Sequence, residues 1–131
     1  MNRRLLLDTH VVYWWLRGDR KLGAKTRGLI ERHECVASVV TLFELLLKSS
    51  VGKLSLPAGP LAPLIEACGF KLLNLTPEHV EVGAALALIH PDPYDRLLLG
   101  VARSERIPLL TRDAALLEAA APMFGDLILE A

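Results

Sequence analysis

The sequence has few cysteines and no long apolar run. Its two cysteines, Cys35 and Cys68, are too few and too isolated for a disulfide framework or a zinc cage, so we predict that both are small, reduced core residues. No apolar stretch approaches the roughly 18–20 residues that cross a membrane. The basic start is interrupted at Asp8 and lacks the small-residue cleavage site of a signal peptide. These absences predict a cytoplasmic protein.

The chain also lacks net charge, internal repeats and any linker-like segment. Its 15 Lys and Arg residues balance 15 Asp and Glu residues, but residues 1–53 carry ten basic and five acidic residues, and residues 54–131 carry five and ten. Two interpretations are open. The folded chain could hold a basic surface beside an acidic pocket, which suits a polyanion next to metal-binding carboxylates, or folding could simply mix the two halves.

The length of 131 residues predicts one domain over residues 1–131, large enough to bury roughly two thirds of the unfolded chain's surface. The hydrophobic content of 52% is high for a small soluble monomer. We therefore expect apolar surface that is covered by a partner protein or by a second copy of the chain in a homodimer.

Short apolar runs alternate with helical patterns, which is typical of an α/β fold with a parallel sheet. Thr76 before Pro77, and Asp92 before Pro93, each predict an N-cap followed by proline at the first helical position. The predicted strands are 4–7, 35–37, 70–73, 107–110 and 126–129, and the predicted helices are 9–16, 22–33, 39–51, 60–67, 77–88, 93–105 and 114–120.

Three acidic residues fall at the ends of these predicted elements. Asp8 follows the first strand, Asp113 follows the strand that ends near Leu110, and Asp95 lies in the first turn of a helix. Ligands of open parallel sheets bind beyond the carboxyl ends of the strands, which favours a site there. Taken singly, however, Asp8 and Asp113 could cap helices, and Asp95 could simply interact with a helix dipole.

A fourth acid, Glu44, lies in a helical segment that is apolar on nearly every side. An unpaired carboxylate buried there would cost about 3–5 kcal/mol, so Glu44 must be paired, protonated or bound to metal. A pair with Lys48 one turn later adds about 0.2–0.5 kcal/mol, too little by itself to justify burial. Asp92 is the opposite case: its position favours a helix cap, with a supporting role at the site as the alternative.

The four acids Asp8, Glu44, Asp95 and Asp113 all offer oxygen ligands, and the sequence has no clustered set of His and Cys. The implied ion is therefore hard, Mg²⁺ or Mn²⁺ rather than Zn²⁺. Four carboxylates can hold one or two such ions, which would activate a water and stabilise the charge that develops on a phosphodiester during hydrolysis.

Other residues are weaker candidates. His10 and His90 lie near acids in sequence but have no evident proton-transfer partner, so we interpret them as structural or substrate-contacting, and His33 and His79 as ordinary helix residues. Trp14 and its aromatic neighbours are more typical of core or partner surface than of base stacking. The residues near the acids that could contact a phosphate are Lys48, Lys53 and Arg96.

The acids lie in four segments: LLLDTH at 5–10, FELLLK at 43–48 with GKL at 52–54, HPDPYDR at 90–96, and LTRD at 110–113. In this order the segments resemble the motifs of PIN-domain ribonucleases, and in particular of toxins of the VapC type. The resemblance extends from about residue 4 to the C-terminus. It implies a PIN-like three-layer α/β sandwich in which helices flank a central, mostly parallel sheet of four to five strands.

The resemblance further implies a metal-dependent RNA endonuclease that is neutralised by a small antitoxin. Asp8 and Asp95 would hold the principal ion, and Glu44 and Asp113 would complete its water shell or hold a second ion. Thr111 matches the family's hydroxyl position beside the last acid. The resemblance assigns no role to Arg112, and Asp92 matches a feature of only some members.

Two other functions are consistent with parts of the pattern. A phosphorelay receiver domain shares the length, the parallel sheet and a Mg²⁺ pocket, but it would need paired acids after the first strand and a lysine at the end of a late strand. Here the single Asp8 and Asp113 occupy those places. The chain could also be a nuclease-like module that only binds RNA or protein. The sequence specifies neither the RNA nor the number of metal ions.

Overall fold

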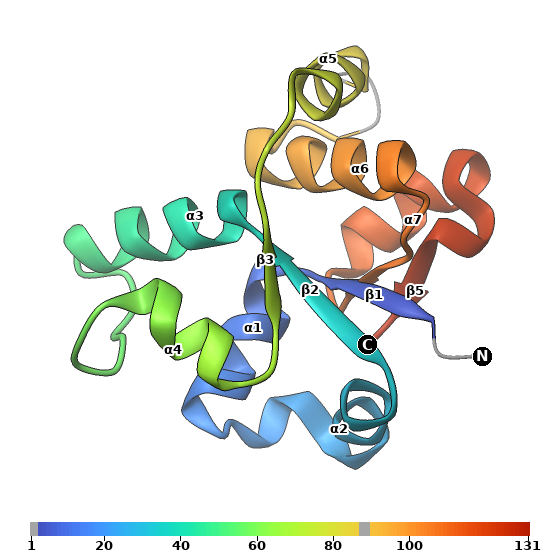
Figure 1. The fold of residues 1–131 in the computed structure, drawn as a ribbon. Helices are drawn as coiled ribbons and strands as arrows, with labels where there is room; N and C mark the ends of the chain where they lie inside the picture. The colour runs from blue at the N-terminus through green and yellow to red at the C-terminus, as the bar shows by residue number, and fades with distance from the viewer. Residues whose placement is uncertain (1–2, 87–89) are drawn as a thin grey trace.

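The structure is a computed structural model, and it describes residues 3–86 and 90–131. Within these residues, five strands form one sheet in the order β3-β2-β1-β4-β5, and each neighbouring pair is parallel (Figure 1). The predicted α/β class with a parallel sheet is confirmed. The strands are β1 (Arg4–Leu7), β2 (Glu34–Ser38), β3 (Lys71–Leu73), β4 (Leu109–Thr111) and β5 (Ile128–Glu130).

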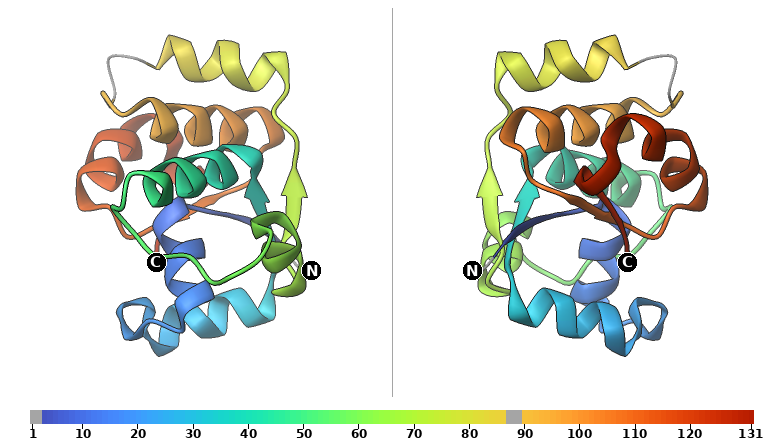
Figure 2. Two further views of the ribbon diagram at one scale, coloured as in Figure 1. Left: turned by 90° about the vertical axis from the view of Figure 1, so that its left-hand side faces the viewer. Right: turned by 90° about the vertical axis from the view of Figure 1, so that its right-hand side faces the viewer.

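Helices cover both faces of the sheet and complete three layers (Figure 2). Successive strand residues point to opposite faces, so Leu6 joins the core under α6 and α7, and Leu5 and Leu7 join the core over α1, α2 and α4. The helices are α1 (Thr9–Arg17), α2 (Gly23–Arg32), α3 (Val39–Ser50), α4 (Leu61–Ala67), α5 (Pro77–Ala85), α6 (Pro93–Glu105) and α7 (Ala114–Phe124), with 3-10 turns η1 (Arg20–Leu22) and η2 (Gly125–Leu127).

Helix α5 packs on α6, away from the sheet (Figure 1). A Cβ on Gly83 would lie 2.8 Å from the Arg96 carbonyl oxygen, and a Cβ on Gly100 would overlap the His79 carbonyl oxygen, so the two backbones meet closely. His79 is buried, and its Nε2 lies 2.9 Å from Glu105 Oε2. His79 lies in a helix, as predicted. In addition, its contact with Glu105 links α5 to α6, which the sequence did not predict.

Several element boundaries differ from the prediction by a few residues. Strand β4 begins at Leu109 rather than residue 107, since the chain enters the sheet through the Pro108 carbonyl, which accepts from Leu6 N at 2.8 Å. Helix α7 extends past the predicted residue 120 to Phe124, which is buried in the core. The turn η2 then delays β5 to residue 128. Residues 87 and 88 of the predicted helix 77–88 lie outside the described residues.

The two cysteines are free and differ in burial. Cys35 is a core residue, and burial raises the pKa of its thiol to about 11. Cys68 is only partly buried, so its prediction as a core residue holds in part. Among the described residues, no helix has both the length and the apolar character needed to cross a membrane.

Candidate metal centre

The predicted acids gather where the strand order reverses. Strands β2 and β3 lie on one side of β1, and β4 and β5 lie on the other. Asp8 directly follows β1, and its N–H donates to the carbonyl of Leu110 in β4 at 3.0 Å. Asp113 lies two residues past the end of β4. This is the topological switch point of the sheet, where open α/β folds bind their ligands.

Asp8 is held in a fixed position by two hydrogen bonds. It is 2% exposed, its Oδ2 accepts from the Thr111 hydroxyl at 2.7 Å, and its Oδ1 accepts from Thr9 N at 2.7 Å. The Thr111 hydroxyl also accepts from Asp113 N at 3.1 Å. Thr111 thus connects the first and last acids. Burial raises the pKa of Asp8, and the Thr111 hydrogen bond partly opposes that effect.

Glu44 is buried and paired, which is one of the three states predicted for it: paired, protonated or bound to metal. Its Oε1 accepts from the Thr9 hydroxyl at 2.7 Å, and its Oε2 lies 2.5 Å from Lys48 Nζ. Thr9 in turn contacts the Thr41 hydroxyl at 3.0 Å. We expected that the pair with Lys48 alone could not account for the burial of Glu44. The structure is consistent with this, since the Thr9 hydroxyl is a second partner of the Glu44 carboxylate.

Asp95 lies close to the other acids, and their charges affect its pKa. Its pKa is raised to about 8, first by burial and then by the negative charges of four neighbouring carboxylates. Such a set of buried like charges is unfavourable unless protons or a cation neutralise it. The four contributing residues are Asp8, Asp92, Asp113 and Glu44.

His90 joins this cluster, which the sequence did not predict. One ligand atom each from His90, Asp95 and Asp113 lie within 4.8 Å of one another, a group within the described residues that could hold a metal ion. His90 Nε2 lies 2.9 Å from Asp95 Oδ2. Of the four predicted acids, Asp95 and Asp113 belong to this group. Asp8 and Glu44 are held in place by threonine hydroxyls, and the charges of both also raise the pKa of Asp95.

Helix capping and membership of the cluster are compatible. Asp92 caps α6, as predicted, by accepting from Tyr94 N at 2.8 Å and Asp95 N at 3.1 Å. Asp113 caps α7 by accepting from Leu116 N at 3.1 Å. Each cap uses Oδ1. Because a carboxylate has two oxygens, a capping Asp can also bind a cation.

The predicted phosphate-contacting residues lie in different places. Lys48 pairs with Glu44; although burial alone would lower the pKa of Lys48, the hydrogen bond to Glu44 and nearby negative charges raise it overall. Lys53 is exposed beyond the end of α3. The Lys48–Glu44 pair is the one that the spacing of one helical turn offered in the sequence.

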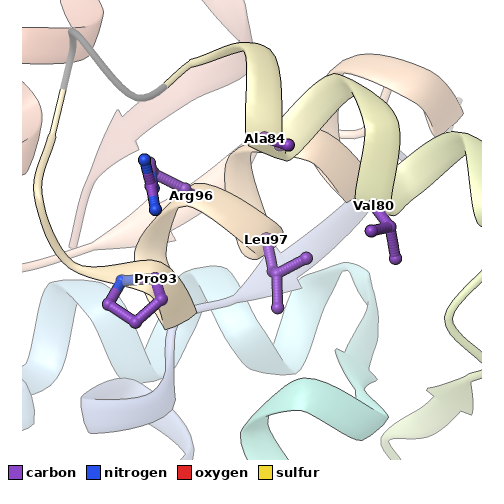
Figure 3. Close-up of a pocket in the computed structure, with 6 residues that line it drawn as sticks. Val80, Ala84, Pro93, Arg96 and Leu97 are labelled. Carbon is purple, nitrogen blue, oxygen red and sulfur yellow. The ribbon is translucent and has the colours of Figure 1, made fainter.

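Arg96 turns toward α5, whereas its neighbour Asp95 faces the acids. With Val80, Ala84 and Leu97 it lines a pocket of about 210 Å³ between α5 and α6 (Figure 3). Its Nε is buried without a hydrogen-bond partner among the described residues. A phosphate contact by Arg96 therefore requires its side chain to move out of this pocket.

A small pocket opens directly beside Asp113. It has a volume of about 190 Å³ and is lined by His10, Trp14, Arg112 and Asp113. The Trp14 and His10 rings lie 5.8 Å apart between centroids, and Arg112 Cζ lies 5.9 Å from the Trp14 ring. The sequence favoured Trp14 as core and left Arg112 unassigned, because only the fold brings α1 next to the end of β4.

The strand order excludes the receiver-domain alternative. Receiver domains have the order 2-1-3-4-5, whereas this sheet has the order β3-β2-β1-β4-β5. The fold and the acidic cluster together define a class: a parallel α/β protein with a carboxylate-rich site at its switch point. The oxygen donors of this site fit a hard divalent ion such as Mg²⁺ or Mn²⁺.

Comparisons with known proteins place the chain within that class. The PIN domain family model matches residues 5–122. Ribonuclease VapC22 of Mycobacterium tuberculosis is 30% identical over 115 residues, which is 86% of this chain and 88% of that protein. The chain belongs to the PIN-domain family.

Solved structures of related shape agree with the fold. VapBC2 from Rickettsia felis, bound to a DNA fragment from its promoter, has a TM-score of 0.68 at 11% identity and covers 98% of each chain. A toxin-antitoxin complex from Klebsiella pneumoniae has a TM-score of 0.66 at 17% identity and covers 95% of each chain. The predicted PIN-like sandwich is therefore confirmed as the fold.

Proposed function

We propose that the chain is a Mg²⁺- or Mn²⁺-dependent endoribonuclease and the toxin of a toxin-antitoxin pair in the cytoplasm. One observation supports this most: carboxylates from four separate segments lie close enough to one another that their charges, added to burial, raise the pKa of Asp95 to about 8. That arrangement suits a divalent cation. The likeness to a protein named as a ribonuclease supports RNA as the substrate class.

In this proposal the acidic residues hold the ion, and threonine hydroxyls orient two of the carboxylates. When bound, a divalent ion supplies a more acidic water and neutralises charge that develops on the scissile phosphate. Asp95 and Asp113 would offer carboxylate oxygens from α6 and from the start of α7, and Asp8 would complete the set from the end of β1. Thr111 fixes Asp8, and Thr9 fixes Glu44, so that both carboxylates are oriented before substrate arrives.

The pocket beside Asp113 is the proposed position of a nucleotide next to the scissile bond. Trp14 and His10 offer ring faces on which a base can stack, and Arg112 offers a positive charge for a phosphate. Single-stranded RNA exposes its bases for such contacts. Lys48, Lys53 and Arg96 remain proposed phosphate contacts farther from this pocket.

Cleavage of labelled single-stranded RNA tests the proposal. The wild-type protein should cut with Mg²⁺ or Mn²⁺ and stop cutting with EDTA, and Asp8→Asn and Asp95→Asn should each reduce the rate by at least about 100-fold. Asp126→Asn, an exposed acid in η2, is the matched control and should cut at the wild-type rate. RNA binding without metal-dependent cutting would instead support a catalytically silent PIN-like binding module.

The proposed antitoxin site is the exposed apolar face of α3. Phe43, Leu46 and Leu47 are 59%, 48% and 43% exposed, and Val51, the residue that follows α3, is 63% exposed. This exposure is consistent with the high apolar content of the sequence. A small antitoxin that lays an apolar segment on this face would remove it from water. A homodimer through the same face is the competing arrangement.

A further inference from the structure

His90 occupies a position that its sequence context did not indicate. It lies just before Asp92, the cap of α6, and its side chain is 12% exposed, comparable to the 14% of Asp95. Its Nε2 lies 2.9 Å from Asp95 Oδ2. The ring is therefore held inside the acidic cluster rather than in solvent.

Asp113 also lies close to His90 and Asp95, and a simple pair between His90 and Asp95 does not explain why. A carboxylate oxygen of Asp113 also lies within 4.8 Å of both ligand atoms. Asp113 caps α7 and Asp95 lies in the first turn of α6, so two separate elements bring carboxylates close to one imidazole. Two carboxylate oxygens and one imidazole nitrogen within 4.8 Å of one another could serve as ligands of one ion.

We propose that His90 is a ligand of the divalent cation, which makes the centre a mixed nitrogen and oxygen site that prefers Mn²⁺ to Mg²⁺. This inference rests on the proposed metal-dependent function. Carboxylate and water oxygens suit both ions, but imidazole nitrogen suits first-row transition ions, and Mg²⁺ seldom accepts it. The nitrogen ligand is thus the feature that distinguishes the two ions.

The observed spacing agrees with this assignment. In an octahedral site with ligand bonds of about 2.1 Å, adjacent ligand atoms lie about 3.0 Å apart. The distance of 2.9 Å between His90 Nε2 and Asp95 Oδ2 has this length, which is also that of an ordinary hydrogen bond. A neutral imidazole with its proton on Nδ1 presents the Nε2 lone pair that coordination needs.

The alternative is that His90 is a positioning residue, whose Nε2–H donates to Asp95 and never touches the ion. The two roles differ in one property that activity cannot reveal: only a ligand places a ¹⁴N nucleus in the first coordination sphere. The variant His90→Asn keeps a polar group near Asp95 but removes the imidazole. His10→Asn is the matched control, since His10 lines the pocket beside Asp113 but lies outside the proposed ligand group.

Pulsed electron paramagnetic resonance on the EDTA-stripped full chain, reloaded with Mn²⁺ alone, provides the test. We expect ¹⁴N modulation of the Mn²⁺ signal in the wild type and in His10→Asn, and its loss in His90→Asn. Calorimetric titration should show that His90→Asn weakens Mn²⁺ binding by at least about 10-fold and changes Mg²⁺ binding much less. The ¹⁴N modulation is measured on the wild-type protein itself, so the test gives a result even if His90→Asn folds poorly.

The outcomes separate this inference from the proposed function. Bound Mn²⁺ without ¹⁴N modulation in the wild type would overturn the ligand role of His90 and leave a metal-dependent nuclease standing. An equal loss of Mn²⁺ and Mg²⁺ affinity in His90→Asn would also overturn the stated ion preference. If the wild type binds neither ion, both the inference and the proposed metal dependence fail.

Discussion

At the scale of single residues, Asp95 makes the metal-free protein less stable as the pH rises. Its pKa is about 8 in the folded chain, against 3.8 for an ordinary Asp. Between these values the folded state keeps a proton that the unfolded state has lost, so the free energy of unfolding falls as the pH rises through this window. Below pH 3.8 both states are protonated, and the effect disappears.

Asp95→Asn should therefore stabilise the protein in EDTA. We expect a Tm increase of about 5 °C at pH 8.5 and a clearly smaller one at pH 5, measured by thermal unfolding. Asp126→Asn should show no such pH-dependent difference, because Asp126 is exposed in η2. An Asp95→Asn variant that is less stable than the wild type at both pH values would contradict the crowding of carboxylates around Asp95.

Thr111 should matter through its hydroxyl rather than its shape. Thr111→Val keeps the volume but removes the donor to Asp8 and the acceptor for Asp113 N, which should lower the free energy of unfolding by about 1–3 kcal/mol and reduce RNA cleavage. Thr111→Ser keeps the hydroxyl and should retain most of the activity. Equal losses in the two variants would show that packing, not the hydrogen bonds, is what Thr111 contributes.

Patterns of neighbouring residues predicted local features such as helix caps better than they predicted contacts between distant parts of the chain. Asp92 as the cap of α6 needed only its place before Pro93, and the structure has that cap. The Thr9 hydroxyl on Glu44 joins residues 35 positions apart, and no local pattern carries such information. His90 was missed for the same reason, since its proximity to Asp113 arises only when α6 and α7 are placed beside each other.

At the scale of elements, starts were easier to predict than ends. Helices α5 and α6 begin where Pro77 and Pro93 require. The extension of α7 through Pro122 to Phe124 was not predictable from local propensity, because burial of Phe124 in the tertiary core offsets the lost backbone hydrogen bond. Tertiary packing decided that boundary.

The close approach of α5 and α6 gives an element-scale prediction. Gly100→Ala would push a methyl group into the His79 carbonyl, so denaturant unfolding should show a loss of about 1–3 kcal/mol. Gly28→Ala in α2 is the control: only the end of the flexible Arg32 side chain lies near the new Cβ, at 2.8 Å, and stability should stay equal or rise by up to about 1 kcal/mol. Similar stability of the two variants would refute a glycine-dependent helix contact.

At the scale of the whole molecule, the strand order creates the site. Asp8 and Asp113 are far apart in sequence, and they meet because β1 and β4 are neighbours in the sheet. The alternation of strands and helices predicted the α/β class, but it did not predict which strand would pair with β1. The crossover connections decide that pairing. The resemblance to PIN domains added the three-layer sandwich with a sheet of four to five strands, but not the pairing of β1 with β4.

The exposed face of α3 should decide partner binding without affecting catalysis. Phe43→Ser combined with Leu47→Ser should abolish binding of the co-expressed antitoxin, measured by calorimetry, while RNA cleavage by the free protein stays near the wild-type rate. A control variant at another exposed apolar position, Met123→Ser, should bind normally. If light scattering instead shows that the double variant turns a dimer into a monomer and leaves antitoxin binding intact, α3 is the homodimer face.

Four acids that are distant in sequence should form one divalent-cation centre at the switch point of the sheet. Anomalous diffraction from crystals soaked with Mn²⁺ tests it most directly, because the signal locates the ion and counts it. We predict a Mn²⁺ peak among Asp8, Asp95 and Asp113, with Glu44 facing it directly or through water. A fully ordered site without a peak, or Mn²⁺ bound only elsewhere on the molecule, would contradict the account.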